Sequence, residues 1–127
     1  MIWGRYREEP AMHEYPITEE IIRIASNAAQ EKNALKVTKI ALVIGDLCGY
    51  AADSIHMYFD EISKGTLCEG CRLKIKRVKP ALKCTVCNNL FEREPYSFKC
   101  PACGADAHPT EIGSEFYVDY IEVEQKE

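Results

Sequence analysis

The segment CTVCNNLFEREPYSFKCPACG, residues 84–104, decides how the rest of the chain is interpreted. It holds two pairs of cysteines, Cys84 with Cys87 and Cys100 with Cys103, and each pair is separated by two residues. Two residues between thiols let a tight turn direct both sulfurs at one ion while backbone amides donate to them. Two such turns facing each other make the tetrahedral cage of four thiolates that is typical of structural zinc. We therefore predict a structural zinc site at these four cysteines.

A third pair with the same spacing, Cys68 and Cys71, complicates this assignment. The spacer between this pair and the next one has the same length as the spacer inside the zinc segment, so spacing alone does not choose between them. Gly104 can adopt the positive φ that a sulfur-binding turn needs, whereas an alternating strand follows Cys71 directly. We expect Cys68 and Cys71 to be small buried side chains at a helix-to-strand junction, and a second metal or redox site is the alternative.

Composition limits the class of protein. A chain of 127 residues is long enough for one domain, or for one domain with a small insert. The net charge of −4 argues against general affinity for nucleic acid or an anionic membrane. No apolar run approaches the roughly 18 residues of a membrane span, and no secretory signal is recognisable. We expect a cytoplasmic protein, where clustered cysteines more often bind metal than form disulfides.

Outside the cysteine segment, hydrophobic spacing predicts two amphipathic helices and three strands. They are the helices 17–32 and 52–64 and the strands 37–47, 72–78 and 114–125. Pro16 suits the first turn of the first helix, and Gly65 ends the second. Leu73 and Ile75 share one face of their strand, with Arg77 next on that face. We predict an α+β fold in which two helices cover a small sheet of about three strands, with an inserted zinc-ribbon-like domain.

Three stretches taken together identify a family: MHEY at 12–15, GTLCEGCRLKI at 65–75, and the cysteine pairs of 84–104. Their arrangement resembles the HypA family of hydrogenase and urease nickel-incorporation proteins over about residues 12–124. The family pattern has small residues where this chain has Cys68 and Cys71, which favours the packing interpretation of that pair. The resemblance implies a nickel metallochaperone, not an enzyme, that delivers Ni²⁺ during assembly of [NiFe]-hydrogenase. It implies as partners the GTPase HypB and the hydrogenase large subunit, and leaves urease accessory proteins and a homodimer open.

In the HypA family the extreme N-terminus holds nickel. Carried over to this chain, the nickel ligands are the amine and amides of Met12, His13 and Glu14, together with the His13 imidazole. Ni²⁺ favours such a square-planar set of nitrogens. Eleven residues precede Met12, so its nitrogen is an ordinary amide in this chain. We expect translation to start at Met12 and residues 1–11 to be a flexible extension; the alternative is that the chain starts at Met1 and binds nickel in a different way.

These predictions define three parts of the chain. They are the extension 1–11, a nickel-binding α/β domain formed by 12–80 plus 110–127, and a zinc-binding domain at 81–109. We expect His56 and a buried Cys48 to be structural. His108 is expected to be an ordinary loop histidine, with a metal-responsive role as the alternative.

Two other classes of protein remain open from the sequence. Four thiolates also suit a single redox iron, which would make the chain a small electron carrier. A zinc-ribbon module that binds nucleic acid would rest on a basic cluster: Arg72, Lys74, Lys76, Arg77, Lys79 and Lys83. The negative net charge favours the simpler view that this cluster is the solvent face of a strand. The sequence shows no catalytic triad and no phosphate-binding glycine loop, so we expect no catalysis.

Overall fold

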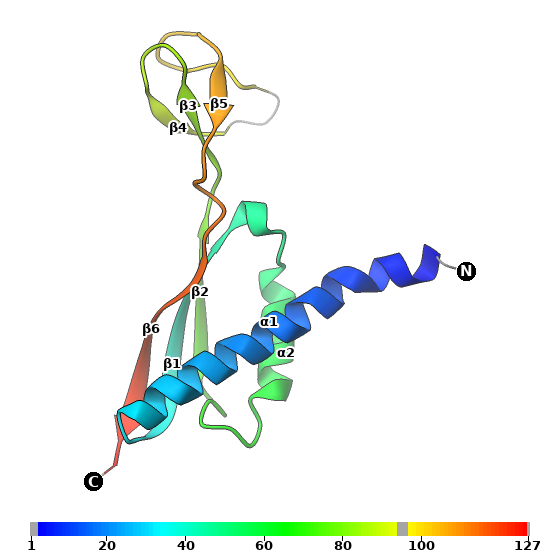
Figure 1. The fold of residues 1–127 in the computed structure, drawn as a ribbon, viewed down its shortest axis with the longest axis vertical. Helices are drawn as coiled ribbons and strands as arrows, with labels where there is room; N and C mark the ends of the chain where they lie inside the picture. Colours follow the sequence, from blue (N-terminus) through cyan, green and yellow to red (C-terminus); the bar gives the residue numbers. More distant parts are fainter. Residues whose placement is uncertain (1–2, 94–96, 127) are drawn as a thin grey trace. The chain divides into compact units, whose positions relative to one another are not determined.

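Over residues 3–93 and 97–126, which the computed structural model describes, the chain forms two α-helices and two small sheets. Side chains are described from Glu14 onward. The elements are α1 (Trp3–Glu31), β1 (Ala34–Gly45), the 3₁₀ turn η1 (Asp46–Cys48), α2 (Ala52–Ile62), β2 (Arg72–Val78), β3 (Ala81–Cys84), β4 (Leu90–Glu92), β5 (Ala107–Pro109) and β6 (Phe116–Gln125). One sheet has the strand order β2-β1-β6 and the other β4-β3-β5 (Figure 1). This is the predicted α+β class.

The chain divides into two compact units. The first comprises residues 1–42, 50–75 and 118–127, and the second comprises 43–49 and 76–117. The segment 81–109, which we expected to be the zinc-binding insert, lies wholly inside the second unit. That unit also includes one end each of β1, β2 and β6. Backbone hydrogen bonds continue the pairing of β1 with β6 there. The amide of Gly45 donates to the carbonyl of Glu115 at 2.7 Å, and that of Leu47 to the carbonyl of Gly113 at 2.8 Å.

The backbones at Gly45 and Gly113 approach very closely. A Cβ atom at residue 45 would lie 1.9 Å from the carbonyl oxygen of Gly113, so no larger residue fits there without displacing a strand. Gly113 itself has a φ of +104°, in the region that favours glycine. Glycine at both positions therefore lets the end of β1 and the turn before β6 approach this closely.

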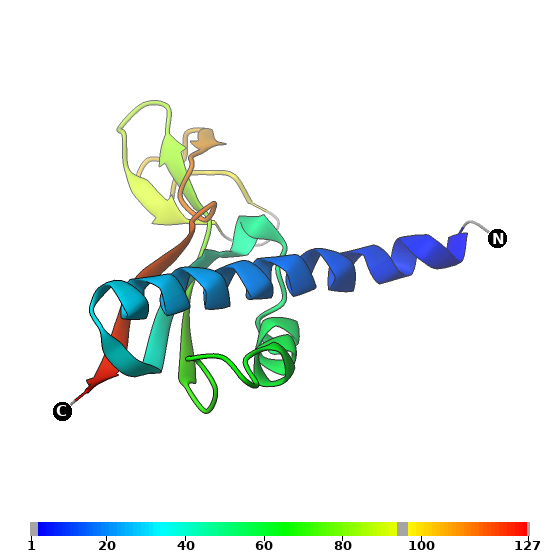
Figure 2. The same ribbon diagram turned by 60° about the horizontal axis from the view of Figure 1, so that its bottom comes forward.

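The hydrophobic core of the first unit is built by α1, β1 and α2. Ile21 and Ala25 lie on one face of α1 at helical spacing, and both are buried. Ile55 and Phe59 of α2 are 0% and 2% exposed, and Ile40 of β1 is 0% exposed. Figures 1 and 2 show both helices on the same side of the sheet. Burying each side chain of this size contributes about 1.5–3 kcal/mol.

The first helix begins earlier than predicted. We expected it to start near Pro16, but α1 begins at Trp3, and its backbone includes residues 3–11 of the expected extension. Pro16 therefore lies inside the helix, where it lacks the N–H that would bond the carbonyl of Met12. The hydroxyl of Thr18 donates to the carbonyl of Glu14 at 2.6 Å just downstream. The predicted start was wrong because proline favours a first turn without being confined to it.

The other elements lie close to their predicted positions. The strand β2 has the predicted ends, and α2 begins at the predicted Ala52 and ends two residues early, at Ile62. The end of β1 was predicted too late, because residues 46–48 turn into η1. Arg77 does not follow the inward face of β2: it is exposed, and its guanidinium donates to Asp46 at 2.9 Å. No helix in the described part of the chain is long and apolar enough to cross a membrane.

Candidate metal centre

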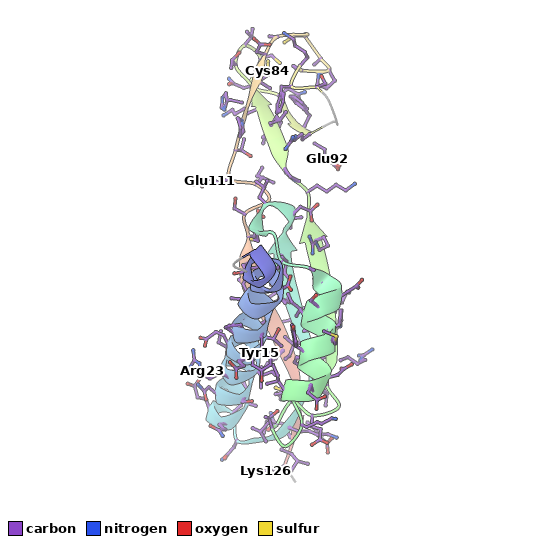
Figure 3. The ribbon with its side chains drawn as sticks, turned by 90° about the vertical axis from the view of Figure 1, so that its right-hand side faces the viewer. Tyr15, Arg23, Cys84, Glu92, Glu111 and Lys126 are labelled. Atoms are coloured by element: carbon purple, nitrogen blue, oxygen red, sulfur yellow. The ribbon has the colours of Figure 1, made fainter. Side chains whose placement is uncertain are left out.

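Four thiols converge in the second unit. The sulfurs of Cys84, Cys87, Cys100 and Cys103 all lie within 4.8 Å of one another. The Sγ atoms of Cys84 and Cys103 are 3.4 Å apart, and those of Cys87 and Cys100 are 3.7 Å apart. Cys84 is the last residue of β3 and is labelled in Figure 3. The second unit thus brings together the four thiols that the sequence pairs predicted would meet, with Cys84 in β3 and the other three outside the strands.

The two cysteine turns have the same backbone design. The amide of Cys84 donates to the carbonyl of Asn89 at 3.0 Å, and the amide of Cys100 donates to the carbonyl of Ala105 at 2.8 Å. In each turn the bond joins the first cysteine to a residue five positions further along, and the second cysteine lies between the two bonded residues. The cluster is therefore formed by two copies of one local structure.

Each turn contains a residue with positive φ directly after its second cysteine. Gly104 has a φ of +80°, as the sequence predicted, and Asn88 takes the corresponding place after Cys87 with a φ of +61°. The sequence analysis did not identify the role of Asn88. Asparagine adopts this conformation more readily than most residues, so its position after the second cysteine was the available signal.

Backbone amides stabilise negative charge on the first cysteine of each turn. The amides of Val86 and Cys87 each donate to the Cys84 sulfur at 3.4 Å, and that of Ala102 donates to the Cys100 sulfur at 3.3 Å. The bond from the Cys87 amide is the main cause that lowers the pKa of Cys84. Burial raises the pKa of Cys100, but bonds from backbone amides outweigh this effect and bring it down to about 6.

The second cysteine of each turn keeps its proton more firmly. The amide of Ala105 lowers the pKa of Cys103, but hydrogen bonding to the Cys84 sulfur and the other thiols raises it to about 12. The pKa of Cys87 is also raised: the amide of Asn89 is the largest single cause and lowers it, but bonding to Cys84, burial and bonding to Cys100 together outweigh that effect. The cluster therefore favours thiolates at Cys84 and Cys100, while a cation must displace protons from the other two.

This donor set fits a structural zinc ion. Four cysteine sulfurs in mutual contact supply the soft, tetrahedral environment that Zn²⁺ accepts. Among the described residues of 81–109, the buried apolar side chains are those of Leu82, Cys84 and Cys100. So little buried apolar surface does not stabilise a folded segment by itself. Bound metal supplies the missing folding free energy directly.

The other cysteine pair does not join the cluster. Cys68 is completely buried, with its sulfur 3.6 Å from the hydroxyl of Ser26, as the packing interpretation predicted. Cys71 is only half-buried, and its amide donates to the carbonyl of Cys68 at 3.0 Å in a tight turn. Burial is the main cause that raises the pKa of both thiols, to about 12 for Cys71. These are properties of protonated packing groups.

The nickel-ligand candidates lie in α1. The side chains of Met12 and His13 fall outside the described residues, and their backbone belongs to the helix. The side chain of Glu14 is buried, and its Oε2 accepts a hydrogen bond from the amide of Ala51 at 2.6 Å. The sequence analysis missed this contact. The available signal was Ala51 itself, since an alanine just before a helix has no side chain with which to cap it.

The remaining candidates are not members of the group of four thiols. His56 is exposed on α2, so it makes no part of the core. His108 lies in β5 opposite Lys83, and its Nδ1 is 3.2 Å from the carbonyl of Pro109. Cys48 is half-buried rather than buried as predicted, and its thiol donates to the carbonyl of Glu115 at 3.2 Å.

The basic cluster on and beside β2 is partly neutralised. Arg77 pairs with Asp46 at 2.9 Å, and the ammonium of Lys79 lies 4.0 Å from a carboxylate oxygen of Glu92. Arg72, Lys74 and Lys76 are exposed at alternate positions, with Leu73 and Ile75 half-buried between them. This is the pattern of a strand with one solvent face, as expected.

Comparison with known proteins gives consistent matches along most of the chain. Residues 12–123 match the family model described as hydrogenase/urease nickel incorporation, metallochaperone, hypA. The hydrogenase maturation factor HypA of Caldanaerobacter subterraneus is 40% identical over 114 residues, which cover 89% of this chain and all of the relative. That of Dehalococcoides mccartyi strain 195 is 35% identical over 115 residues, covering 91% of this chain and 97% of the relative.

Solved structures show the same fold. The solution structure of the nickel metallochaperone HypA from Helicobacter pylori matches with a TM-score of 0.60 and 21% identity, covering 89% of this chain and 98% of that one. A second solution structure of a HypA protein matches with a TM-score of 0.67 and 21% identity, covering 91% and 98%. With the family model, the relatives and the cluster of four thiols in agreement, this chain belongs to the HypA family of nickel metallochaperones.

Proposed function

We propose that this chain binds Ni²⁺ at residues 12–14 and transfers it to a [NiFe]-hydrogenase during maturation. The observation that carries this proposal is the family match, which begins at Met12. Imidazole and deprotonated amide nitrogens together suit the square-planar preference of Ni²⁺. His13 supplies the imidazole, and the backbone of residues 12–14 supplies the other nitrogens.

The same proposal assigns a resident Zn²⁺ to Cys84, Cys87, Cys100 and Cys103. Its support is the mutual contact of the four sulfurs and the amides that donate to two of them. Zinc has no redox chemistry and a closed set of four protein ligands has no open position, so this ion holds structure rather than reacting. The carrier and the zinc unit then have separate roles within one chain.

A protein that carries nickel must release it to a recipient. The proposed partners are the GTPase HypB and the large subunit of the hydrogenase, with urease accessory proteins and a second copy of this chain as further candidates. Maturation of a cytoplasmic apo-enzyme places the carrier in the cytoplasm. Its action is transfer of an ion and not catalysis, so we propose no substrate turnover.

Calorimetric titration with Ni²⁺ tests the nickel assignment. The chain and a version beginning at Met12 should each bind one Ni²⁺, with the shorter version tighter because it offers a free amine in place of an amide. Losing one strong donor weakens binding by roughly tenfold or more, about 1.4 kcal/mol. His13→Ala should abolish binding in both versions, whereas His56→Ala, at an exposed histidine of α2, should leave it unchanged. Nickel binding that survives His13→Ala would contradict the assignment.

A further inference from the structure

Glu14 has an unusual place for a carboxylate. The residue is 3% exposed, and its Oε2 lies 2.6 Å from the backbone nitrogen of Ala51. A carboxylate that leaves water loses free energy unless hydrogen bonds replace its hydration. The short bond from the Ala51 amide is such a replacement, and bonds of this charged kind are stronger than neutral ones.

The partner of Glu14 is the beginning of α2. Ala51 occupies the N-cap position, with φ −88° and ψ 120°, and no side chain caps the helix from within its own sequence. Carboxylates are favoured at helix N-termini, where backbone N–H groups are unpaired and the helix dipole is positive. The Glu14 carboxylate therefore accepts, from α1, the N-cap N–H that a glutamate three residues into α2 would accept in a capping box.

A neighbouring contact fastens the same turn of α1 to α2. The rings of Tyr15 and Tyr58 meet edge to face, with centroids 5.3 Å apart and planes at 75°. Figure 3 labels Tyr15 at the place where the two helices contact each other. The carbonyl of Glu14 also accepts the Thr18 hydroxyl at 2.6 Å. The side chain and the carbonyl of Glu14 thus both accept hydrogen bonds, and the ring of the next residue, Tyr15, packs on α2.

The turn just before Glu14 has one helical backbone bond fewer. Pro16 has no N–H, so it cannot donate the helical bond that the carbonyl of Met12 would accept. Coordination of nickel by the amides of His13 and Glu14 requires those nitrogens to lose their protons and leave the helical pattern. Residues 12–13 must therefore rearrange, and the nearest point fixed by a described side chain is the Glu14 carboxylate.

We propose that Glu14 is a positioning residue for the nickel site: its carboxylate, bound to the Ala51 amide, holds residues 12–13 at the start of α2 while they rearrange around the ion. This inference rests on the proposed nickel function of residues 12–14. The side chain of Glu14 acts through the backbone and is not itself a nickel ligand. The start of α2 is then part of the support of the nickel site.

Substitution of Glu14 in the full chain separates this role from direct coordination. Glu14→Ala should weaken Ni²⁺ binding roughly tenfold, the scale of one lost hydrogen bond to a charged group. Glu14→Gln keeps an oxygen that accepts the Ala51 N–H, so it should retain affinity within about threefold and the same nickel absorption spectrum. Glu19→Ala, at an exposed glutamate of α1, is the matched control and should change neither.

A change on the other side of the bond gives an independent test. Ala51→Pro removes the donor N–H, and φ at residue 51, −88°, is near the range that proline allows. It should weaken nickel binding as Glu14→Ala does, and the two changes combined should be no worse than either alone, since both remove one contact. Zinc content and helix content, measured on every variant, should be unchanged.

The outcomes distinguish this inference from the function on which it rests. No nickel binding by the unsubstituted chain, or binding that His13→Ala leaves intact, would overturn the nickel assignment. Binding that His13→Ala abolishes but Glu14→Ala and Ala51→Pro leave unchanged would overturn the positioning role alone. A loss in Glu14→Gln as large as in Glu14→Ala, with an altered nickel spectrum, would make the carboxylate a ligand and also overturn the positioning role.

Discussion

The two units of this chain are stabilised by different kinds of contact. In the first unit, large apolar side chains such as Ile21, Ile40 and Phe59 are almost completely buried. In the segment 81–109 of the second, Leu82 and Cys84 are the described residues with fully buried side chains. Hydrophobic burial stabilises the first unit, whereas the four cysteine ligands on two turns, together with the metal they bind, stabilise the segment 81–109. The difference teaches that one chain of this size can contain two units that fail for independent reasons.

Removing one thiolate is the strongest test of whether the two units are stabilised independently. Cys84→Ala should release zinc and unfold residues 81–109, because structural zinc provides about 10–16 kcal/mol to a small metal-bound unit. The helices of the first unit should remain folded. Zinc content by mass spectrometry and residue-level hydrogen exchange measure both effects. Cys71→Ala is the matched control and should keep one zinc per chain. Zinc retained in Cys84→Ala but lost in Cys68→Ala would show that the wrong pair was assigned.

The converse change should act on the first unit alone. Phe59→Ala leaves a cavity under α2, where the ring is 2% exposed, and should cost about 3–5 kcal/mol. Urea unfolding followed by helical circular dichroism measures this loss, while zinc stays at one per chain. The exposed Met57→Ala serves as the control on the same helix and should change stability little. Loss of zinc with loss of the Phe59 ring would mean that the two units unfold together.

Acid should release zinc before it affects the first unit. Zinc must displace the protons of Cys87 and Cys103, whose pKa values are raised, to about 12 for Cys103. Affinity therefore falls as pH falls, by up to about a hundredfold per unit for two protons. Below pH 6 the dependence should steepen, because the pKa of Cys100 is about 6. A zinc indicator titrated between pH 8 and 5 follows this release. An affinity independent of pH would contradict the assigned protonation.

The smallest predicted effect concerns a single turn. Asn88 has a φ of +61°, so Asn88→Ala should destabilise zinc binding by about 1 kcal/mol, and Asn88→Gly should not. Competition with a chelator resolves a difference of this size, with the adjacent turn residue Val86→Ala, exposed in the structure, as the control. Equal zinc affinity in the alanine and glycine variants would show that the left-handed conformation at this position carries no cost.

The features that could be predicted from sequence are those determined by neighbouring residues. The cysteine spacing predicted the four-thiol cluster, and the alternation of Leu73 and Ile75 predicted β2 with its observed ends. Helical spacing likewise predicted α2. In each case the pattern repeats within a few residues, so local propensity and the final packing agree.

The features that were missed depend on contacts across long stretches of sequence. Glu14 bonds Ala51 across 37 positions, and Arg77 bonds Asp46 across 31. Neither contact produces a repeating pattern in the sequence, because each depends on which elements become neighbours after folding. The start of α1 was missed for another reason: Pro16 is compatible with a first turn and with a helix interior, and only the structure distinguishes them.

The burial of Cys68 and the partial burial of Cys71 bear on whether a nickel carrier offers its ion a second binding site. A protein that binds nickel briefly must not contain a second site that binds the ion more tightly. With a pKa of about 12, Cys71 carries its proton at neutral pH, and its neighbour Cys68 has no exposed surface. An ion would have to expel that proton and enter packed protein to reach both sulfurs. The fold thus makes two of its thiols poor metal ligands, so that fewer groups in the chain compete for the nickel ion before it is transferred to a recipient.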